Sequence, residues 1–352
     1  MSLIRAVRTR VRREPLRAPF ITALRTVTEI EAVAVEVQDA DGRIGIGEAV
    51  ATGPITGDLA GGIVAALDGP LRTAVLGRDI EDFEDLLRAV DAAVVGNHSA
   101  KAALDIALHD LRARTYGVPL HRLLGCGRAS VGSDVTISVE APRAMAEQAA
   151  ARVADGFGTL KLKVADDPAI DVERVRRIRD TVGPEVRLRL DANQGWSAKQ
   201  AVAIMTELER AEIGIEFLEQ PVPAADLAGL AFVAQRIATP VMADESAATA
   251  ADVLRIVEAR AAEIINVKLM KCGGLRPARA IIDIAAAGGL SVLIGGMMET
   301  AVGVGAAASL AATLPDGLVH DVDPAWWLAR SPLRYENGQL LLPADPGLAG
   351  CT

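Results

Sequence analysis

Two lysines stand close together in the stretch GTLKLKVADD, residues 158–167, which is otherwise apolar until its last residues. Alternation along a strand places the side chains of Lys161 and Lys163 on the same face. Lysine is almost never fully buried unless its charge is paired. Two ammonium groups aimed the same way from a buried strand therefore indicate a site that handles charge.

Carboxylates recur at the ends of the next apolar runs along the chain. Asp191 lies in VRLRLDAN, Glu219 in GIEFLEQP and Asp244 in PVMADES, and Lys268 follows in EIINVKLMK. Successive members of this series are about one β/α unit apart, a spacing that charged helix faces do not produce. Three convergent carboxylates repel each other unless a cation compensates their charge. Hard oxygen ligands with no neighbouring His or Cys select magnesium.

The lysines flank this carboxylate group, with Lys163 on the run before it and Lys268 on the run after it. Lysines on opposite sides of a metal site suit removal of a proton from one face of a substrate and delivery to the other. A divalent ion and neighbouring cations lower a lysine pKa toward the range of a general base. We expect one member of the pair 161/163 to act as a base and the other to hold the negative charge of the substrate.

Alternating strands and helices are expected to position these groups. From about residue 132, eight strand candidates alternate with mostly Ala-rich helical segments. This pattern predicts a (β/α) barrel, a modified TIM barrel, with its chemistry at the C-terminal ends of the strands. The candidates are DVTISV, TLKLKV, VRLRLDAN, GIEFLEQP, PVMADES, EIINVKLMK, LSVLIGG and GLVHDVD. A doubly wound sheet is the alternative, but the sequence has no GxGxxG turn.

The residues before the barrel predict a second domain. Strands followed by helices are typical of an α+β domain. The strands are expected at about 3–12, 29–39 and 43–50, and the helices at roughly 57–77, 81–93 and 98–116. We expect this capping domain to span 1–125 and to be completed by about 328–352, with the barrel at 126–327.

Composition argues against several classes of protein. A formal net charge of −9 does not suit a nucleic-acid-binding surface. The most apolar region, 284–314, is interrupted by Glu299 before it reaches the ~18 residues that span a bilayer. The basic N-terminus lacks the apolar segment of a signal peptide. The three cysteines are far apart and form no CxxC pair, so we expect free thiols in the cytoplasm.

The motifs resemble those of the enolase superfamily, specifically its muconate-lactonizing-enzyme subgroup. The KLK strand, DANQGW, EQP, ADES and INVKLMKCGG occur in the order and spacing of that subgroup. The segment NHSAKAALDIALHDLRARTYGVPLHRLLG is similar to the helix that leads into its barrel. The resemblance covers nearly the whole chain. It implies magnesium-dependent removal of a proton beside a carboxylate, through an enediolate, as is general for enolase-superfamily sites.

The resemblance also assigns roles to individual residues. Asp191, Glu219 and Asp244 match the magnesium ligands. Lys163 and Lys268 match the two acid/base groups. Lys161 matches the lysine that supports the substrate carboxylate. Those that match substrate contacts are Thr136, Gly296 and Met298, although some relatives have a serine in place of Gly296. Asn193 in DANQGW is expected near the site, and Glu299 in GGMMET is expected behind the residues that touch the substrate.

The end of the eighth strand narrows the choice of reaction. LVHDVDPAWW carries Asp321 and Asp323 two residues apart, hence on one face directed into the site. Two carboxylates there suit a cation, and a dipeptide has a free ammonium group. Muconate, succinylbenzoate precursors and N-succinyl amino acids lack such an ammonium group. The DxD pair resembles the feature that marks dipeptide epimerases, with a turn-capping DVDP as the alternative interpretation.

Two N-terminal segments resemble loops that close the site in such enzymes. ITALRTVTE, residues 21–29, is similar to the loop of L-Ala-D/L-Glu epimerases in which an arginine meets the glutamate side chain, and Arg25 holds that place. ATGPITGD, residues 51–58, corresponds to the second mobile loop. A surface salt bridge is the alternative role for Arg25.

We therefore expect a magnesium-dependent dipeptide epimerase, with L-Ala-D/L-Glu as the first substrate to consider. An N-succinylamino-acid racemase or a muconate-type cycloisomerase is the alternative within the family, and a non-catalytic peptide-binding protein is the alternative from another class. The expected partner is a small dipeptide rather than nucleic acid or a membrane. Barrels of this family often assemble, so a homo-oligomer is also considered.

Overall fold

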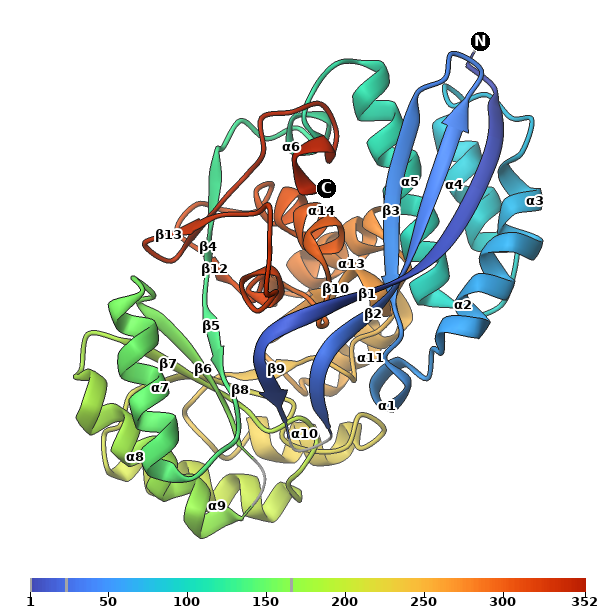
Figure 1. Ribbon diagram of the computed structural model, residues 1–352. Coiled ribbons are helices and arrows are strands. Elements are labelled where there is room, and N and C mark those ends of the chain that lie inside the picture. Colours follow the sequence, from blue (N-terminus) through green and yellow to red (C-terminus); the bar gives the residue numbers. More distant parts are fainter. Residues whose placement is uncertain (1, 23–24, 165–166) are drawn as a thin grey trace.

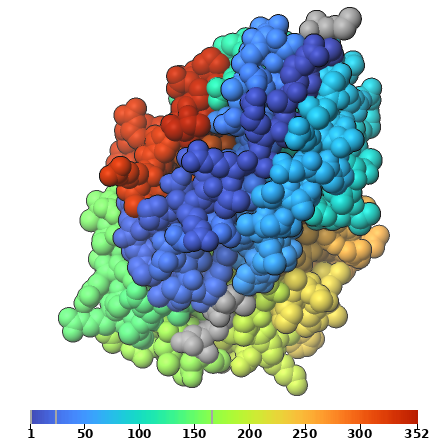
Figure 2. All heavy atoms as spheres, turned by 45° about the vertical axis from the view of Figure 1, so that its right-hand side comes forward, coloured from blue at the N-terminus to red at the C-terminus, as the bar shows by residue number. Residues whose placement is uncertain are grey.

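An antiparallel sheet and its helices form the N-terminal part of the computed structural model, which describes residues 2–22, 25–164 and 167–352 (Figure 1). Its strands are β1 (Ile4–Ile21), β2 (Thr26–Asp39) and β3 (Ile44–Val50). β1 and β2 are longer than the sequence predicted, because their pairing continues out to Ile21↔Thr26. This extension carries the hairpin to the barrel, and Figure 2 shows the N-terminal residues lying across it. Residues 23 and 24 of the predicted loop 21–29 lie outside the described residues.

The helices of this part cover one face of the sheet (Figure 1). They are α1 (Gly53–Thr56), α2 (Ala60–Ala66), a π-helix (Leu67–Leu71), α3 (Arg72–Val75), α4 (Phe83–Ala92) and α5 (His98–Thr115). The helical stretch predicted at roughly 57–77 has a kink at Gly69, which has non-helical angles, and at Pro70, which has no N–H to donate. α5 lies close against β3, because a side chain at Gly45 or Gly47 would collide with the backbone of α5.

Eight strands follow and close into a barrel, which confirms the predicted fold class. β5 to β11 form one parallel sheet in sequence order. β12 closes the circle, because Asp134 N donates to His320 O at 2.9 Å and Gly296 N donates to Asp321 O at 2.9 Å. The strands are β5 (Val135–Ile137), β6 (Thr159–Lys163), β7 (Arg187–Asp191), β8 (Ile215–Glu219), β9 (Val241–Ala243), β10 (Ile264–Lys268), β11 (Ser291–Gly295) and β12 (Val319–His320).

Helices alternate with these strands, as the sequence predicted. Seven of them are α7 (Pro142–Ala154), α8 (Pro168–Val182), α9 (Ala198–Arg210), α10 (Leu227–Ala234), α11 (Ala250–Ala259), α13 (Leu275–Ala287) and α14 (Ala301–Ala311). The short helix α6 (Leu120–Leu123) precedes β4 (Ser130–Ser133), and the short helix α12 (Leu269–Cys272) follows β10. Capping boxes at Ser197 and Thr249 fix where α9 and α11 begin, which sets the length of the loops before them.

Residues in the left-handed backbone conformation follow two of the strands that end at predicted carboxylates. Asn193 and Gln194 follow Asp191 with φ of 41° and 70°, and Gln220 follows Glu219 with φ of 34°. Asparagine adopts this conformation more readily than most residues. The Gln220 side chain accepts from Asp244 N at 2.9 Å, so it ties the ends of two neighbouring strands together.

The C-terminal residues contact both parts of the molecule. β14 (Gln339–Leu341) pairs with β4 and with β13 (Tyr335–Glu336). Further on, Leu348 N donates to Asp110 of α5 at 2.5 Å. The division into domains at residues 125 and 327 stays a prediction. In the described ranges, no helix combines the length and the apolar character needed to cross a membrane.

Candidate active site

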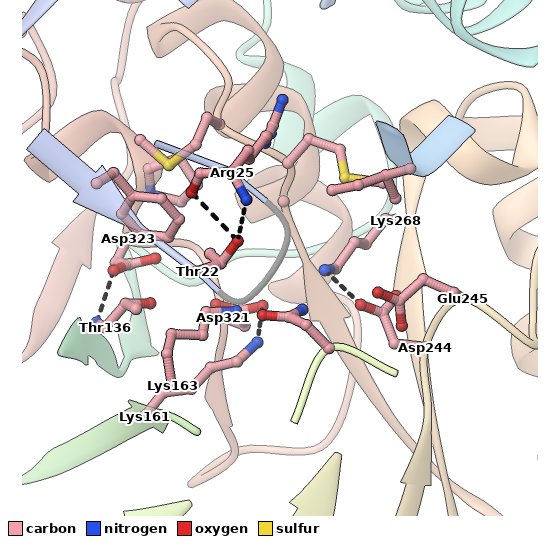
Figure 3. A pocket seen from close by; sticks show the side chains of 17 residues that line it. Thr22, Arg25, Thr136, Lys161, Lys163, Asp244, Glu245, Lys268, Asp321 and Asp323 are labelled. Atoms are coloured by element: carbon pink, nitrogen blue, oxygen red, sulfur yellow. Dashed lines mark hydrogen bonds and ion pairs between the residues drawn. The ribbon is translucent and has the colours of Figure 1, made fainter. Parts of the chain in front are cut away.

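A pocket opens at the C-terminal ends of the barrel strands, between the barrel and the N-terminal hairpin (Figure 3). Its walls include most of the residues that the sequence singled out. These are Arg25, Thr136, Lys161, Lys163, Asn193, Asp244, Lys268, Gly296, Met298, Asp321 and Asp323. Asp191, Glu219 and Glu299 do not line it, and all three are buried.

Lys161 lies at the centre of three carboxylates. Its Nζ is 3.1 Å from Asp191 Oδ2, 2.8 Å from Glu219 Oε2 and 2.8 Å from Asp321 Oδ2. Burial alone lowers a lysine pKa, but these carboxylates outweigh burial and raise the pKa of Lys161 well above its ordinary value. Lys161 therefore carries a positive charge among these carboxylates, suited to hold a negative group.

Lys163 and Lys268 face the pocket from different sides. Lys163 Nζ is 2.5 Å from Asp191 Oδ2, and Lys268 Nζ is 2.7 Å from Asp244 Oδ2. Burial lowers the pKa of Lys268, but the carboxylate of Asp244 outweighs it and raises that pKa above the ordinary lysine value. A cation bound by Asp244 would compete for this carboxylate and lower the pKa of Lys268, as the sequence argument expects.

Each of the three predicted metal ligands is fixed through one oxygen and presents the other to lysine. Asp191 Oδ1 accepts from the Asn193 N–H at 2.9 Å, and Glu219 Oε1 accepts from Asn266 Nδ2 at 2.8 Å. Asp244 Oδ1 lies 2.7 Å from Lys271 Nζ. The oxygens that remain, Asp191 Oδ2, Glu219 Oε2 and Asp244 Oδ2, therefore face positive charge.

The electrostatics of this group fit a divalent cation. Burial, followed by repulsion from Asp191, raises the pKa of Glu219 to about 7. Burial also opposes ionisation of Asp191, but Lys163 and Lys161 outweigh it and hold that pKa at about 2. Additional positive charge would keep Glu219 ionised beside its neighbours. A set of three carboxylates is also the donor chemistry that magnesium prefers.

A second acidic cluster lies next to the first, because Lys161 contacts both. Single carboxylate oxygens of Asp134, Asp321 and Asp323 all fall within 4.8 Å of one another, and all three residues are buried. Burial and repulsion from Asp321 raise the pKa of Asp323 to about 6. Asp134 Oδ1 has no hydrogen-bond partner within the described ranges. Arg189 lies 2.7 Å from Asp134 Oδ2 and Lys161 lies 2.8 Å from Asp321 Oδ2, so two cations face three carboxylates. The one negative charge that remains suits a bound cation such as an ammonium group.

The backbone and an indole position Asp323. Its Oδ2 accepts from Thr136 N at 2.8 Å and from Trp327 Nε1 at 3.0 Å. Phe20 of the N-terminal hairpin contacts Trp327 edge-to-face, with ring centroids 5.3 Å apart. The same ring stands 6.0 Å from Lys163 Nζ. The hairpin thus places an apolar cover over the lysine and the acidic cluster.

Arg25 reaches the pocket from the N-terminal side. In Figure 3 it lies across the pocket from Lys161 and Lys163. Its guanidinium makes no hydrogen bond or ion pair with any residue that the structure describes. Burial lowers its pKa from the ordinary value. The surface salt bridge considered for Arg25 is therefore absent from the described part of the chain.

Several site residues escaped the sequence argument. Lys271 contacts Asp244 and Asn266 O, and Glu245 lines the pocket with a pKa that burial and Asp244 raise to about 8. Asp134 precedes β5, and Phe20 comes from the hairpin. Lys271 and Glu245 stand inside the quoted motifs KLMK and ADES, which was the available signal. Asp134 opens the quoted strand DVTISV, two residues before Thr136, whereas Phe20 gave no signal because its place depends on the hairpin.

Two buried lysines, Lys163 and Lys268, line a pocket beside three buried carboxylates at the C-terminal ends of the strands of a β/α barrel. A family model described as "Enolase C-terminal domain-like" matches residues 144–350. One described as "Mandelate racemase / muconate lactonizing enzyme, N-terminal domain" matches residues 4–125. The chain belongs to the enolase superfamily, which confirms the resemblance stated from its motifs.

Individual relatives are similar over almost their full length. The L-Ala-D/L-Glu epimerase of Clostridium acetobutylicum is 42% identical over 338 residues, 95% of this chain and 94% of that protein. The substrate-liganded L-Ala-D/L-Glu epimerase of Bacillus subtilis has a TM-score of 0.96 at 40% identity, covering 99% of both chains. The dipeptide epimerase of Enterococcus faecalis, complexed with Mg and L-Leu-L-Tyr, has a TM-score of 0.93 at 36% identity, covering 99% of both chains.

Proposed function

We propose that this protein is a magnesium-dependent dipeptide epimerase, an isomerase that inverts the α-carbon of the C-terminal residue. The observation that carries the proposal is one pocket lined by Lys163 and Lys268 on opposite sides and by the buried carboxylates Asp321 and Asp323. Similarity to three dipeptide epimerases supports the same reaction.

The lysines divide the work on the substrate. Asp191, Glu219 and Asp244 would hold the magnesium ion, which would supply positive charge next to the substrate carboxylate and favour loss of the neighbouring α-proton. Lys161 adds a fixed charge at the same end. Lys163 removes the proton from one configuration and Lys268 from the other. The lysine that does not take the proton delivers one to the opposite face.

The acidic cluster selects the length and type of substrate. Asp321 and Asp323 bind the free ammonium of the first residue, while the lysine end binds the C-terminal carboxylate. The separation between the two ends then favours two residues. N-succinyl amino acids and muconate would bring further negative charge toward Asp321 and Asp323, so the cluster argues against a racemase or cycloisomerase of those compounds.

Arg25 favours an acidic side chain on the second residue. A half-buried guanidinium without a partner among residues 2–22, 25–164 and 167–352 can form a bidentate pair with a carboxylate, one of the stronger polar contacts. L-Ala-D/L-Glu is therefore the proposed substrate, as in the relatives from C. acetobutylicum and B. subtilis.

A screen of dipeptide mixtures in deuterated water, read by mass spectrometry, tests the proposal. We expect deuterium at one carbon of L-Ala-L-Glu and smaller incorporation into L-Ala-L-Leu. Faster exchange of N-succinyl amino acids or faster turnover of muconate would replace the proposal with the alternative reaction of the family. No exchange with any compound would favour a peptide-binding protein.

The proposed partner is the dipeptide alone, and the proposed location is the cytoplasm. Cys126, Cys272 and Cys351 are free thiols, which suits a reducing compartment. The net charge of −9 disfavours binding to nucleic acid or to an anionic membrane surface. Assembly into a homo-oligomer stays a prediction.

A further inference from the structure

Two buried carboxyl groups from different parts of the fold meet behind the pocket. Glu48 stands on β3 of the N-terminal sheet, and Glu299 follows β11 of the barrel, with exposed fractions of 3% and 0%. Both point toward Gly303 of α14. A Cβ atom there would collide with Glu299 Oε2 and would lie 2.9 Å from Glu48 Oε1. Only a residue without a side chain leaves space for both oxygens.

The two carboxyl groups have different sets of donors. Glu48 Oε1 accepts from Thr300 N at 2.8 Å, and Glu48 Oε2 accepts from the Thr300 hydroxyl. These contacts place Glu48 at the N-terminus of α14, where free N–H groups favour a negative charge. Glu299 Oε1 accepts from Met297 N at 2.7 Å, but Glu299 Oε2 has no partner in the described part of the chain.

The surroundings favour one negative charge on the pair rather than two. Burial, then repulsion from Glu48 and Asp321, raises the pKa of Glu299 to about 8, although the Met297 N–H and Lys268 oppose this. Burial also raises the pKa of Glu48, while Thr300, Gly303 and Arg12 oppose it. A proton on Glu299 Oε2 would allow that oxygen to donate and would give Glu48 a further hydrogen bond.

We propose that Glu299 is protonated and donates from Oε2 to Glu48 Oε1, forming an acid pair that ties the N-terminal sheet to the segment Gly296–Met298. That segment lines the pocket, and Glu299 holds its Met297 N–H. Neither glutamate lines the pocket, so both are positioning residues. The consequence for substrate rests on the proposed epimerase function, whereas the shared proton does not.

The pH dependence of thermal unfolding tests the shared proton without any substrate. A carboxyl whose pKa is higher in the folded chain than in the unfolded chain loses stabilising effect as pH rises between the two values. The Tm of the wild type should therefore fall relative to E299Q from pH 5 to about pH 8. The unfolding constant should change by up to about tenfold per pH unit. E36Q, which removes an exposed carboxylate of β2, should show no such widening.

The variant E48Q provides the second arm. It keeps an acceptor for Thr300 but removes the charge that repels ionised Glu299, so the difference between E48Q and E48Q/E299Q should widen less with pH. If E299Q fails to fold, wild type against E48Q gives the same comparison. A difference in Tm between wild type and E299Q that stays constant from pH 5 to 8, or that decreases with rising pH, would mean that Glu299 is ionised. That result would overturn the acid pair.

Kinetics separate positioning from simple stability. E299Q keeps an acceptor for Met297 N–H and E299A does not, so KM for L-Ala-L-Glu should rise more in E299A. Equal KM values in the two variants would remove the positioning role. Absence of activity in every variant and in wild type would instead refute the epimerase function, while the Tm comparison would still decide the acid pair.

Discussion

Lys163 and Lys268 end strands that stand opposite each other in the barrel. β6 and β10 are separated by β7, β8 and β9, and each lysine holds a different carboxylate, Asp191 or Asp244. A group bound between the two lysines presents one face to each of them. This relationship allows a proton to leave on one side of a carbon and return on the other, which inverts its configuration.

Removal of either lysine should abolish epimerisation but leave different exchange reactions. K163A and K268A each lose the base for one configuration, so the surviving lysine still exchanges the α-proton of one epimer with solvent. Deuterium incorporation into L-Ala-L-Glu and L-Ala-D-Glu, followed separately by NMR, measures this. K199A, which removes an exposed lysine of α9, should behave as wild type. Equal exchange of the same epimer by both variants would contradict the two-sided assignment.

Neutral replacements at the carboxylate group should remove magnesium binding. D191N, E219Q and D244N each delete one charged oxygen ligand while keeping the size of the side chain. Isothermal titration with Mg²⁺ should show no measurable binding, and circular dichroism should show a retained fold. D180N, at an exposed carboxylate of α8, is the matched control. EDTA should abolish wild-type activity, and added Mg²⁺ should restore it. Full activity in a metal-free preparation would refute the magnesium site.

The predictable part of the site is the part that follows the barrel period. Four parallel strands of the barrel, β6, β7, β8 and β10, end at Lys163, Asp191, Glu219 and Lys268. Parallel strands bring these ends to one edge of the barrel. The sequence could not predict Asp134 or Glu48 in the same way. Their roles depend on β12 closing against β4 and on β3 contacting α14, and neither contact leaves a periodic signal.

Two elements of the N-terminal part differ from prediction. The hairpin of β1 and β2 extends past its own helices because it packs on the barrel, a tertiary effect that local alternation does not carry. The helical stretch predicted at roughly 57–77 has a kink at Gly69 and Pro70, a residue pair that typically marks a turn.

Acid should weaken substrate binding before it slows turnover. The pKa of Asp323 is raised to about 6, chiefly by burial and next by Asp321. Below that pH the group is a neutral acid and no longer attracts ammonium, so KM for the dipeptide should rise by up to about tenfold per pH unit. A bound ammonium favours the ionised form, so kcat should hold to lower pH than kcat/KM. D323N should show a high KM that varies little from pH 5 to 7. A wild-type KM that is constant over this range would contradict the role of Asp323.

Arg25 should determine the preference for an acidic second residue. R25A removes a guanidinium that lines the pocket and has no partner among the residues the structure describes. Loss of a hydrogen bond to a charged group costs about 1.5–3 kcal/mol, which is roughly a 10- to 150-fold decrease in kcat/KM. The decrease should appear with L-Ala-L-Glu and hardly at all with L-Ala-L-Leu. R10A, at an exposed arginine of β1, should change neither value. Equal losses on the two substrates would make Arg25 a structural residue and would shift the preference toward hydrophobic dipeptides.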